Sequence, residues 1–256
     1  MGEQGTGDTD RDKLAEQLEK VTKEFRDFSY IISHDLKAPL RGIKALADWL
    51  SEDYSDKLDD DGREQMALLV KRVNRMHNLL DGVLEYSRVG RVQEEHAQIN
   101  LNELLTEIID MASVPENIKV TVDENMPTII CEEKCVIQIF ENLIKNAVTY
   151  MDKDQGTVHI SFADDGESWK FSVKDNGPGI PEDQFEKIFK IFQTLQAKDE
   201  FESTGVGLTI VKKIVEMYGG KVWPESTIGE GTTFYFTLPK KIAVTQDSPA
   251  EATTAN

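Results

Sequence analysis

Apolar residues recur at alternating steps of three and four along the start of the chain, and this heptad spacing constrains the fold more than any other feature. The first series comprises Leu14, Leu18, Val21, Phe25, Phe28, Ile32 and Leu36. Such spacing places every apolar side chain on one seam of a long helix. A second series follows a polar turn and comprises Met66, Leu69, Val73, Met76, Leu80 and Val83. The sequence therefore predicts a hairpin of two long helices at residues 14–94, after a disordered stretch at residues 1–13.

A single helical hairpin has too little core to bury both apolar series. We therefore expect it to pair with a second copy of itself and to form a four-helix bundle in a homodimer. The alternative is a coiled-coil spacer without a further role. That alternative leaves the sequence HDLKAP, which begins at His34, unexplained.

The chain beyond the hairpin predicts a second domain of a different class. Residues 88–98 are polar and lose the helical period, so we predict a linker at residues 95–98. Residues 99–241 then mix amphipathic helices (101–112, 135–151, 207–220) with alternating strands (157–162, 169–173, 232–239). This mixture is typical of an α/β sandwich. The polar tail at residues 242–256 is predicted to be disordered.

The charge balance and the polar N-terminus exclude several classes of partner. Lys and Arg number 29 against 47 Asp and Glu, which gives a formal charge of -18 and repels nucleic acid and anionic membranes. No segment approaches the ~18 apolar residues of a membrane helix, and the acidic start is not a signal peptide. We expect a cytoplasmic chain. Cys131 and Cys135 lack further metal-ligand residues nearby and are interpreted as partly buried thiols.

His34 is the candidate for covalent chemistry. It lies two positions from both Ile32 and Leu36, so a helix directs its ring away from the seam and into solvent. A neutral imidazole keeps a lone pair for attack on a phosphoryl group, and the neighbouring carboxylate of Asp35 can hold the ring tautomer. Pro39 has no backbone N–H, so it should loosen the helix one turn later. The other histidines are interpreted as surface residues: His77, His96 and His159.

Asparagine and glycine motifs in the second domain favour a nucleotide site. DNGPGI begins at Asp175, directly after a predicted strand, although alone it is a common turn sequence. Upstream, Asn142 and Asn146 lie four residues apart on one helix face. Downstream, Gly205 and Gly207 precede a predicted helix, and a GEGT sequence precedes the last strand. The order of these motifs carries more weight than any one of them.

The segment FSYIISHDLKAPLRGI resembles the phospho-acceptor box of sensor histidine kinases. The later motifs resemble the Asn and Gly boxes of the Bergerat nucleotide fold, which histidine kinases share with gyrase, the Hsp90 chaperones and mismatch-repair ATPases. Their order is that of the kinase branch, and the segment from Phe192 is similar to kinases related to phytochromes. The resemblance covers roughly residues 14–240. It implies a helical-hairpin dimerisation domain followed by an α/β sandwich of the Bergerat type, with ATP and Mg²⁺ as cofactors.

The resemblance also implies roles for individual residues. His34 would accept the γ-phosphoryl group of ATP and pass it to an aspartate of a response regulator. Asp175 would accept a hydrogen bond from the adenine amino group, and Asn146 would give an amide oxygen to Mg²⁺. The other implied nucleotide-site residues are Asn142, Tyr150, Gly177, Gly179, Ile180, Gly205, Gly207 and Leu208. Two lysines are candidates to offset phosphate charge: Lys145 and Lys198.

Some positions separate this chain from parts of the family. Gyrase and the chaperones carry a water-activating glutamate where this chain has Asn142, whose amide is no base, so the resemblance favours a kinase. Many relatives carry Thr or Asn where this chain has Ala38, and that side chain orients the water that dephosphorylates the regulator. We therefore expect weak phosphatase activity. Thr149 replaces a lysine that many relatives carry. No sensor domain precedes the hairpin, so we expect it to be absent from this chain.

The segment between the Gly boxes predicts packing and a lid. Phe185, Phe189 and Phe192 have helical spacing and are interpreted as packing residues, whereas the polar residues 193–204 are interpreted as a lid over the nucleotide. Two alternatives to a kinase remain. One is a Bergerat-fold ATPase or anti-sigma-type serine kinase, against which the HDLKAP box argues. The other is a pseudokinase scaffold that binds nucleotide and a regulator without transfer.

Overall fold

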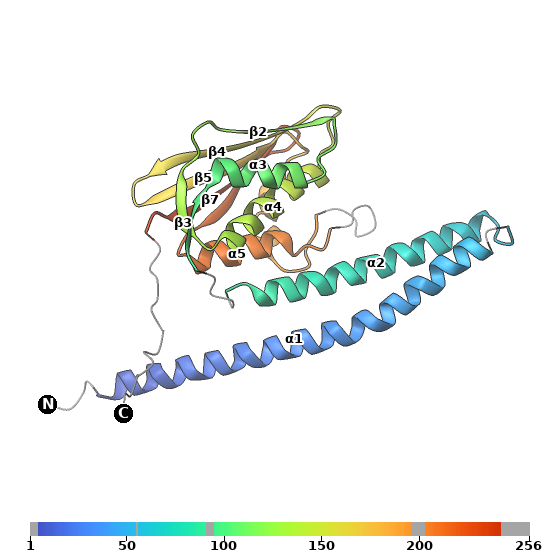
Figure 1. Ribbon diagram of the computed structural model, residues 1–256, viewed down its shortest axis with the longest axis horizontal. Coiled ribbons are helices and arrows are strands. Elements are labelled where there is room, and N and C mark those ends of the chain that lie inside the picture. Colours follow the sequence, from blue (N-terminus) through green and yellow to red (C-terminus); the bar gives the residue numbers. More distant parts are fainter. Residues whose placement is uncertain (1–4, 55, 91–94, 196–202, 242–256) are drawn as a thin grey trace, which may run out of the picture. The chain divides into compact units, whose positions relative to one another are not determined.

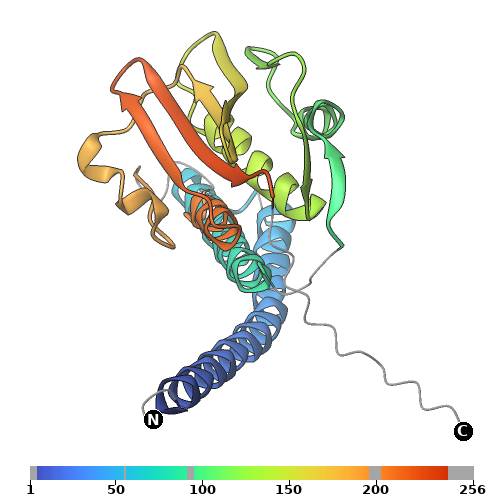
Figure 2. The same ribbon diagram turned by 90° about the vertical axis from the view of Figure 1, so that its left-hand side faces the viewer.

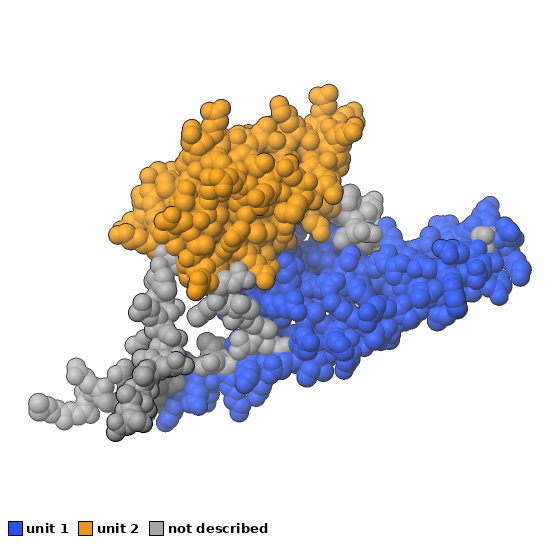
Figure 3. Space-filling view, in the orientation of Figure 1, with its two compact units in different colours: residues 1–93, 180–214 blue, residues 94–179, 215–256 orange. Residues whose placement is uncertain are grey.

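The computed structural model describes four stretches of the chain, residues 5–54, 56–90, 95–195 and 203–241. They divide into two compact units, which Figure 3 shows in different colours: residues 1–93 with 180–214, and residues 94–179 with 215–256. This division differs from the sequence expectation, because residues 180–214 group with the hairpin and not with the rest of the predicted second domain. No helix in the four described stretches is long and apolar enough to cross a membrane.

Unit 1 is built on a helical hairpin. Its helices are α1 (Gly5–Asp53) and α2 (Asp60–Arg88), which run side by side in Figure 1. Residues 5–13 are helical although they were predicted to be disordered, because extending an existing helix gains a hydrogen bond for each residue fixed. Pro39 lies inside α1 without ending it. The second view of the ribbon also shows α1 as one unbroken helix (Figure 2).

The hairpin buries a face of α1 that lies next to the first apolar series and includes Leu40 and Ala47, with which the predicted seam continues. The buried side chains of α1 are Ser29, Ser33, Leu40 and Ala47, and those of α2 include Val73 and Leu84. Small side chains such as Ser33 let two helices approach closely. The seam side chains are exposed in the single chain: Leu14, Val21, Phe25, Phe28, Ile32 and Leu36. One face of α1 is therefore used within the hairpin, and a second, apolar face is left open.

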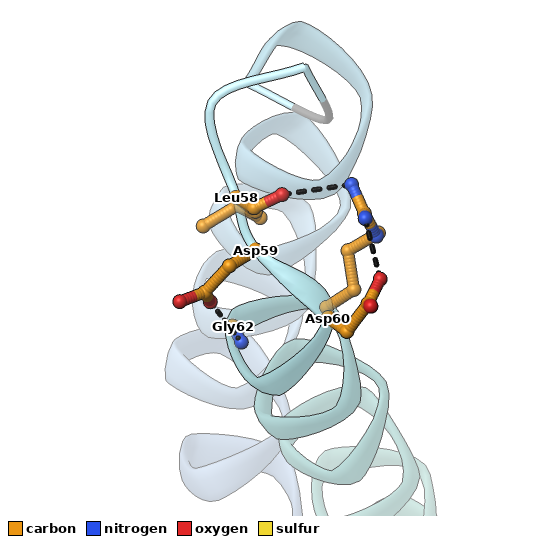
Figure 4. A network of polar contacts seen from close by, with 5 residues as sticks. Leu58, Asp59, Asp60 and Gly62 are labelled. Carbon is orange, nitrogen blue, oxygen red and sulfur yellow. Dashed lines mark hydrogen bonds and ion pairs between the residues drawn. The ribbon is translucent and has the colours of Figure 1, made fainter.

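The turn between the two helices is closed by side-chain contacts to the backbone (Figure 4). Asp59 caps α2, since its side chain accepts a hydrogen bond from the Gly62 N–H at 2.8 Å. Arg63 donates to the Leu58 carbonyl oxygen and to the Asp60 carboxylate, both at 2.7 Å. A cap of this kind contributes about 1 kcal/mol to helix stability. These contacts fix where α2 begins.

Unit 2 is an α/β structure with one main sheet. Its elements up to the fourth helix are β1 (Ala97–Asn100), α3 (Leu101–Met111), β2 (Ile118–Val122), β3 (Thr128–Cys131) and α4 (Glu133–Thr149). The later strands are β4 (Gly156–Asp165), β5 (Ser168–Asp175), β6 (Val222–Thr227) and β7 (Gly231–Pro239). The five-stranded sheet has the order β2-β4-β5-β7-β6, and only the β2–β4 pair is parallel. β1 and β3 form a separate antiparallel pair, so residues 97 and 98 of the predicted linker belong to a strand.

Helix α4 packs on this sheet through an apolar stripe. The Phe140 ring meets the rings of Phe171 and Phe236 edge-on, with centroids 6.0 Å and 5.5 Å apart, and all three side chains are fully buried. Each large aromatic side chain removed from water stabilises the fold by about 2–3 kcal/mol. Asn142 and Asn146 lie half-buried at one edge of the stripe. The stripe thus sets which way these two amides face.

The remaining elements of unit 1 are short, apart from the last helix. They are η1 (Glu182–Gln184), η2 (Lys187–Phe189) and α5 (Gly207–Met217), whose last turn continues into unit 2. The predicted packing of three phenylalanines is corrected for Phe192, which is exposed, whereas Phe185 and Phe189 are half-buried and Ile188 is buried. Two 3₁₀ turns, with three residues per turn, do not place side chains spaced four and three apart on one face. Residues 196–202 of the predicted lid lie outside the described residues.

Candidate functional site

His34 lies on the open surface of α1, as the spacing predicted. Its side chain is 73% exposed and that of Asp35 is 72% exposed, with His34 Nδ1 3.1 Å from Asp35 Oδ1. An ionised carboxylate only accepts hydrogen bonds, so this contact places the ring proton on Nδ1. The lone pair of a neutral ring is then on Nε2. The arrangement offers a solvent-facing nucleophile with a carboxylate at its other nitrogen.

A groove with basic side chains follows His34 along the hairpin. Lys37 forms an ion pair with Asp81 of α2, and Lys44 pairs with Asp48 of α1 at 2.7 Å. Beyond it lies an open pocket of about 390 Å³, lined by Arg41, Lys44, Asn74, His77 and Asn78. His34, Lys37, Arg41 and Lys44 are spaced three, four and three residues apart, which is one face of a helix. The sequence reasoning missed this groove, although that spacing was a signal that could have revealed it.

Two of the three other histidines, His77 and His96, are less exposed than the predicted surface position implies. His77 is half-buried in the groove, and His96 has a buried Nε2 without a hydrogen-bond partner among the described residues. His96 precedes β1 and lies edge-on to the Tyr218 ring, so it is packed and not free in solvent. His159 alone fits the expectation, since it is exposed on β4 and contacts Asp123 at 3.1 Å.

Asp175 ends β5 and is the carboxylate among the predicted nucleotide residues. Its Oδ1 accepts hydrogen bonds from the Gly177 N–H at 2.9 Å and the Thr232 N–H at 3.2 Å. Burial raises the pKa of Asp175, the two backbone donors act in the opposite direction, and the charge of Asp152 adds to the rise. No described hydrogen bond uses Oδ2 of this half-buried side chain, so an acceptor oxygen remains for a ligand.

The loop after Asp175 is packed too closely for larger residues at its glycines. A Cβ on Gly177 would lie 3.0 Å from Asp175 Oδ1. Gly179 has a φ of +77°, and a Cβ there would overlap the Thr227 carbonyl oxygen. The Gly229 N–H donates to the Pro178 carbonyl oxygen at 2.7 Å, which ties this loop to the turn before β7. The close backbone contacts hold the loop in one shape.

Replacement of Gly179 by Ala is expected to lower the free energy of unfolding by about 2–4 kcal/mol, because it adds an overlap with backbone to an unfavourable φ. Gly166 is the matched control, since its φ of +69° is similar and nothing lies within 4 Å of a Cβ there. Gly166→Ala should cost only about 1 kcal/mol. Urea unfolding of both variants measures the difference. Equal losses would contradict the close approach at Gly179.

The C-terminal half of α4 lies next to the Asp175 loop. The Tyr150 carbonyl oxygen is 3.7 Å from the position of a Cβ on Gly177. Asn142 donates to the Gln138 carbonyl oxygen at 2.8 Å, so its amide is engaged within the helix. Asn146 is half-buried, and its side chain has no hydrogen bond to any described residue. Lys145 is exposed, one position round the helix from Asn146.

The other predicted nucleotide residues belong to unit 1. The Gly205 carbonyl oxygen accepts a hydrogen bond from the Phe192 N–H at 2.9 Å, and Gly207 is the first residue of α5. Ile180 and Leu208 are half-buried. Lys198 lies outside the described residues.

The two cysteines are more buried than predicted. Cys131 is fully buried and Cys135 nearly so, and both are free thiols. Burial raises the pKa of Cys135 to about 12, so the thiol stays protonated at neutral pH. The described residues contain no group of three His, Cys, Asp or Glu side chains that could hold a metal ion. The cysteines are therefore packing residues.

Two protein families match the chain. Residues 24–91 match the His Kinase A (phospho-acceptor) domain, and residues 131–242 match the family of histidine kinase-, DNA gyrase B- and HSP90-like ATPases. The first match contains His34 and Asp35, and the second contains Asn146 and Asp175. The solvent-facing histidine and the half-buried carboxylate thus lie in the matches to two different families.

The chain is also similar to individual proteins along most of its length. Cyanobacterial phytochrome B of a Nostoc species is 42% identical over 235 residues, which cover 89% of this chain and 31% of that protein's length. Full-length ShkA in complex with AMPPNP is 27% identical with a TM-score of 0.60, and the match covers 85% of this chain and 46% of ShkA. Histidine kinase ThkA in complex with response regulator protein TrrA is 25% identical with a TM-score of 0.58, over 89% of this chain and 66% of the ThkA chain.

Proposed function

Because the chain belongs to the histidine kinases, we propose that it is an ATP-dependent protein histidine kinase, which phosphorylates His34 and then passes the phosphoryl group to an aspartate of a response regulator. The observation that carries this proposal is the geometry at His34. The ring is exposed on α1, its Nδ1 is held by Asp35, and its Nε2 is left for attack.

This geometry supports a transfer to His34 in the following way. Nε2 attacks the γ-phosphorus of ATP, an N–P bond forms, the bond from phosphorus to the bridging oxygen breaks, and ADP leaves. Positive charge develops on the imidazole during the attack. The Asp35 carboxylate stabilises that charge and can take the Nδ1 proton. The phosphoramidate on His34 is then ready for attack by a carboxylate of the regulator.

ATP binding is supported by the residues of the second family match. The free Oδ2 of Asp175 suits the adenine amino group, which is a hydrogen-bond donor. Asn146 would hold Mg²⁺ through its amide oxygen, since Mg²⁺ prefers oxygen ligands and keeps phosphate and water in its other positions. Bound Mg²⁺ supplies positive charge beside the phosphates. The amide of Asn142 offers no base for water, which favours a bound ATP that survives until it meets His34.

The proposal is tested by incubating the protein with γ-labelled ATP and Mg²⁺. We expect protein-bound label that acid removes and alkali does not, and we expect EDTA or the substitution Asn146→Ala to abolish it. ATP turnover without such label would instead indicate a Bergerat-fold ATPase. Nucleotide binding with neither would indicate a pseudokinase scaffold.

We further propose a homodimer and a response regulator as partners. The exposed seam of α1 supports the homodimer, because a single chain leaves that apolar stripe in water. The groove after His34 supports a regulator that presents carboxylates there, because the Arg41 guanidinium lines it with hydrogen-bond donors. ThkA, whose structure contains a response regulator, is a similar chain. The match spans 31% of the length of the phytochrome relative. We also propose a cytoplasmic location, which the acidic charge balance of the chain supports.

Dephosphorylation of the regulator is expected to be weak. Ala38 is exposed one turn after His34, and a methyl group cannot hold a water molecule by hydrogen bonding. The substitution Ala38→Thr is expected to raise the Mg²⁺-dependent loss of phosphate from the regulator at least about fivefold, within the ~10²-fold range of positioned catalytic groups. Release of phosphate from the labelled regulator measures it. Strong dephosphorylation by the unmodified protein, without ADP, would contradict the expectation.

A further inference from the structure

Tyr30 lies one helical turn before His34, and its ring stacks on the imidazole. The ring centroids are 6.4 Å apart and the planes differ by 23°. Residues four apart on a helix are neighbours on its surface, and this separation is within the range of offset aromatic pairs. The Tyr30 side chain is 57% exposed, so burial does not account for its position. The ring is two positions from both Phe28 and Ile32, and so it faces away from the seam as His34 does.

The contact with Asp35 does not by itself fix the orientation of the imidazole ring. The single contact from Nδ1 to Asp35 Oδ1 fixes one atom of the ring, but the exposed side chain can still swing about that contact. Rotation about it moves Nε2, because Nε2 lies on the opposite side of the ring. A neighbouring ring nearly parallel to the imidazole restricts this rotation. The two contacts together define the direction of the Nε2 lone pair.

We propose that Tyr30 is a positioning residue for phosphoryl transfer, whose ring holds the imidazole of His34 with Nε2 directed outwards for in-line attack on the γ-phosphorus. This inference rests on the proposed kinase function. Tyr30 contacts the imidazole and acts through it. Its contribution is orientation before the reaction, so it affects the rate of transfer and not the binding of ATP.

The ring and not the hydroxyl carries this role. Stacking needs the aromatic face, which phenylalanine also has. Tyr30→Phe is therefore expected to keep the rate of His34 phosphorylation within about twofold of the unmodified protein. Tyr30→Ala removes the stacked face and should lower the rate at saturating ATP by roughly fivefold, with the KM for ATP unchanged.

Tyr54→Ala is the matched control, because Tyr54 is also an exposed tyrosine of the hairpin and follows the end of α1, far along the chain from His34. It should leave the rate unchanged. Circular dichroism and light scattering verify that each variant keeps its helices and its oligomeric state. A normal rate in Tyr30→Ala, or an equal loss in Tyr30→Phe, would overturn the proposal.

A second measurement separates this proposal from the kinase function. The chain has four histidines, so NMR of protein carrying labelled histidine resolves the His34 ring, which His34→Gln assigns. Without ATP, couplings across the His34 side chain should report one rotamer in the unmodified protein and in Tyr30→Phe, and averaging in Tyr30→Ala. If this holds while no label ever reaches His34, the kinase function fails and the positioning contact stands. If the rotamers do not differ, the positioning role is refuted even in an active kinase.

Discussion

The substitution His34→Gln is expected to remove all acid-labile, alkali-stable label from the protein. Glutamine is a good helix former, and the side chain it replaces is exposed, so α1 should keep its structure. Its amide nitrogen has no available lone pair for attack on phosphorus. Nucleotide affinity should be unchanged, because His34 and Asp175 belong to different units. Electrophoresis after incubation with labelled ATP measures the effect.

The control for this experiment is His159→Gln. His159 is exposed on the sheet of unit 2 and contacts Asp123 and Thr121, so the same change of side chain is made away from α1. It should retain full labelling. Label that persists in His34→Gln with the same resistance to alkali would place the acceptor on another histidine. Label that alkali removes would indicate a carboxylate acceptor, and the chemistry assigned to His34 would be wrong.

The substitution Asp175→Asn should weaken nucleotide binding by about 100-fold, which corresponds to ~2.7 kcal/mol. The carboxylate accepts two backbone N–H groups on one oxygen and keeps the other for the base. Asparagine has only one acceptor oxygen. If that oxygen satisfies Gly177 and Thr232, the amide N–H₂ faces the adenine amino group, and donor opposes donor. The reverse orientation leaves the two buried backbone donors unpaired.

Calorimetric titration with AMPPNP measures this loss, and Asp164→Asn is the control. Asp164 is also at the end of a sheet strand, but it is exposed and pairs with Lys240 at 2.6 Å. Its replacement should leave the affinity unchanged. Unchanged binding in Asp175→Asn would exclude this carboxylate as the adenine acceptor.

The pKa of Asp175 predicts opposite effects of pH on binding and on stability. Burial raises this pKa, so the folded protein favours the neutral carboxyl group. Its contribution to stability is therefore present at acid pH and lost as the pH rises through the raised pKa. Binding of the adenine amino group needs the carboxylate, so affinity should fall on acidification, starting above the ordinary value of about 3.9. At neutral pH, Asp175→Asn should then have a Tm no lower than that of the unmodified protein.

The sequence predicted the helices and strands that carry the site better than the contacts between them. Heptad spacing located both helices of the hairpin and the outward direction of His34, because helical periodicity is a local property of the chain. The burial of Phe140 against the sheet likewise follows from the spacing of apolar residues in α4. Alternating residues in β4, β5 and β7 predicted strands for the same reason.

Properties that depend on contacts between distant residues were not predicted. Periodicity alone could not indicate that Ser29 and Ser33 face the hairpin interior while the seam stays open, since small polar side chains carry no hydrophobic signal. Phe192 was assigned to packing, but its φ of 65° and the hydrogen bond to Gly205 place it in a turn. The two donors on Asp175 come from residues two and 57 positions away, and only the sheet brings the second one close.

The continuity of α1 gives this chain a mechanical property. One helix extends from Gly5 past His34. A rotation of its first residues about the helix axis therefore also rotates the face that carries His34. Each residue of a helix advances by about 100°, so a single inserted residue upstream would rotate the seam out of phase with the histidine face, whereas seven would restore it to within about 20°. The number of residues between the start of α1 and His34 thus sets the rotational position of His34 as well as its distance along the helix.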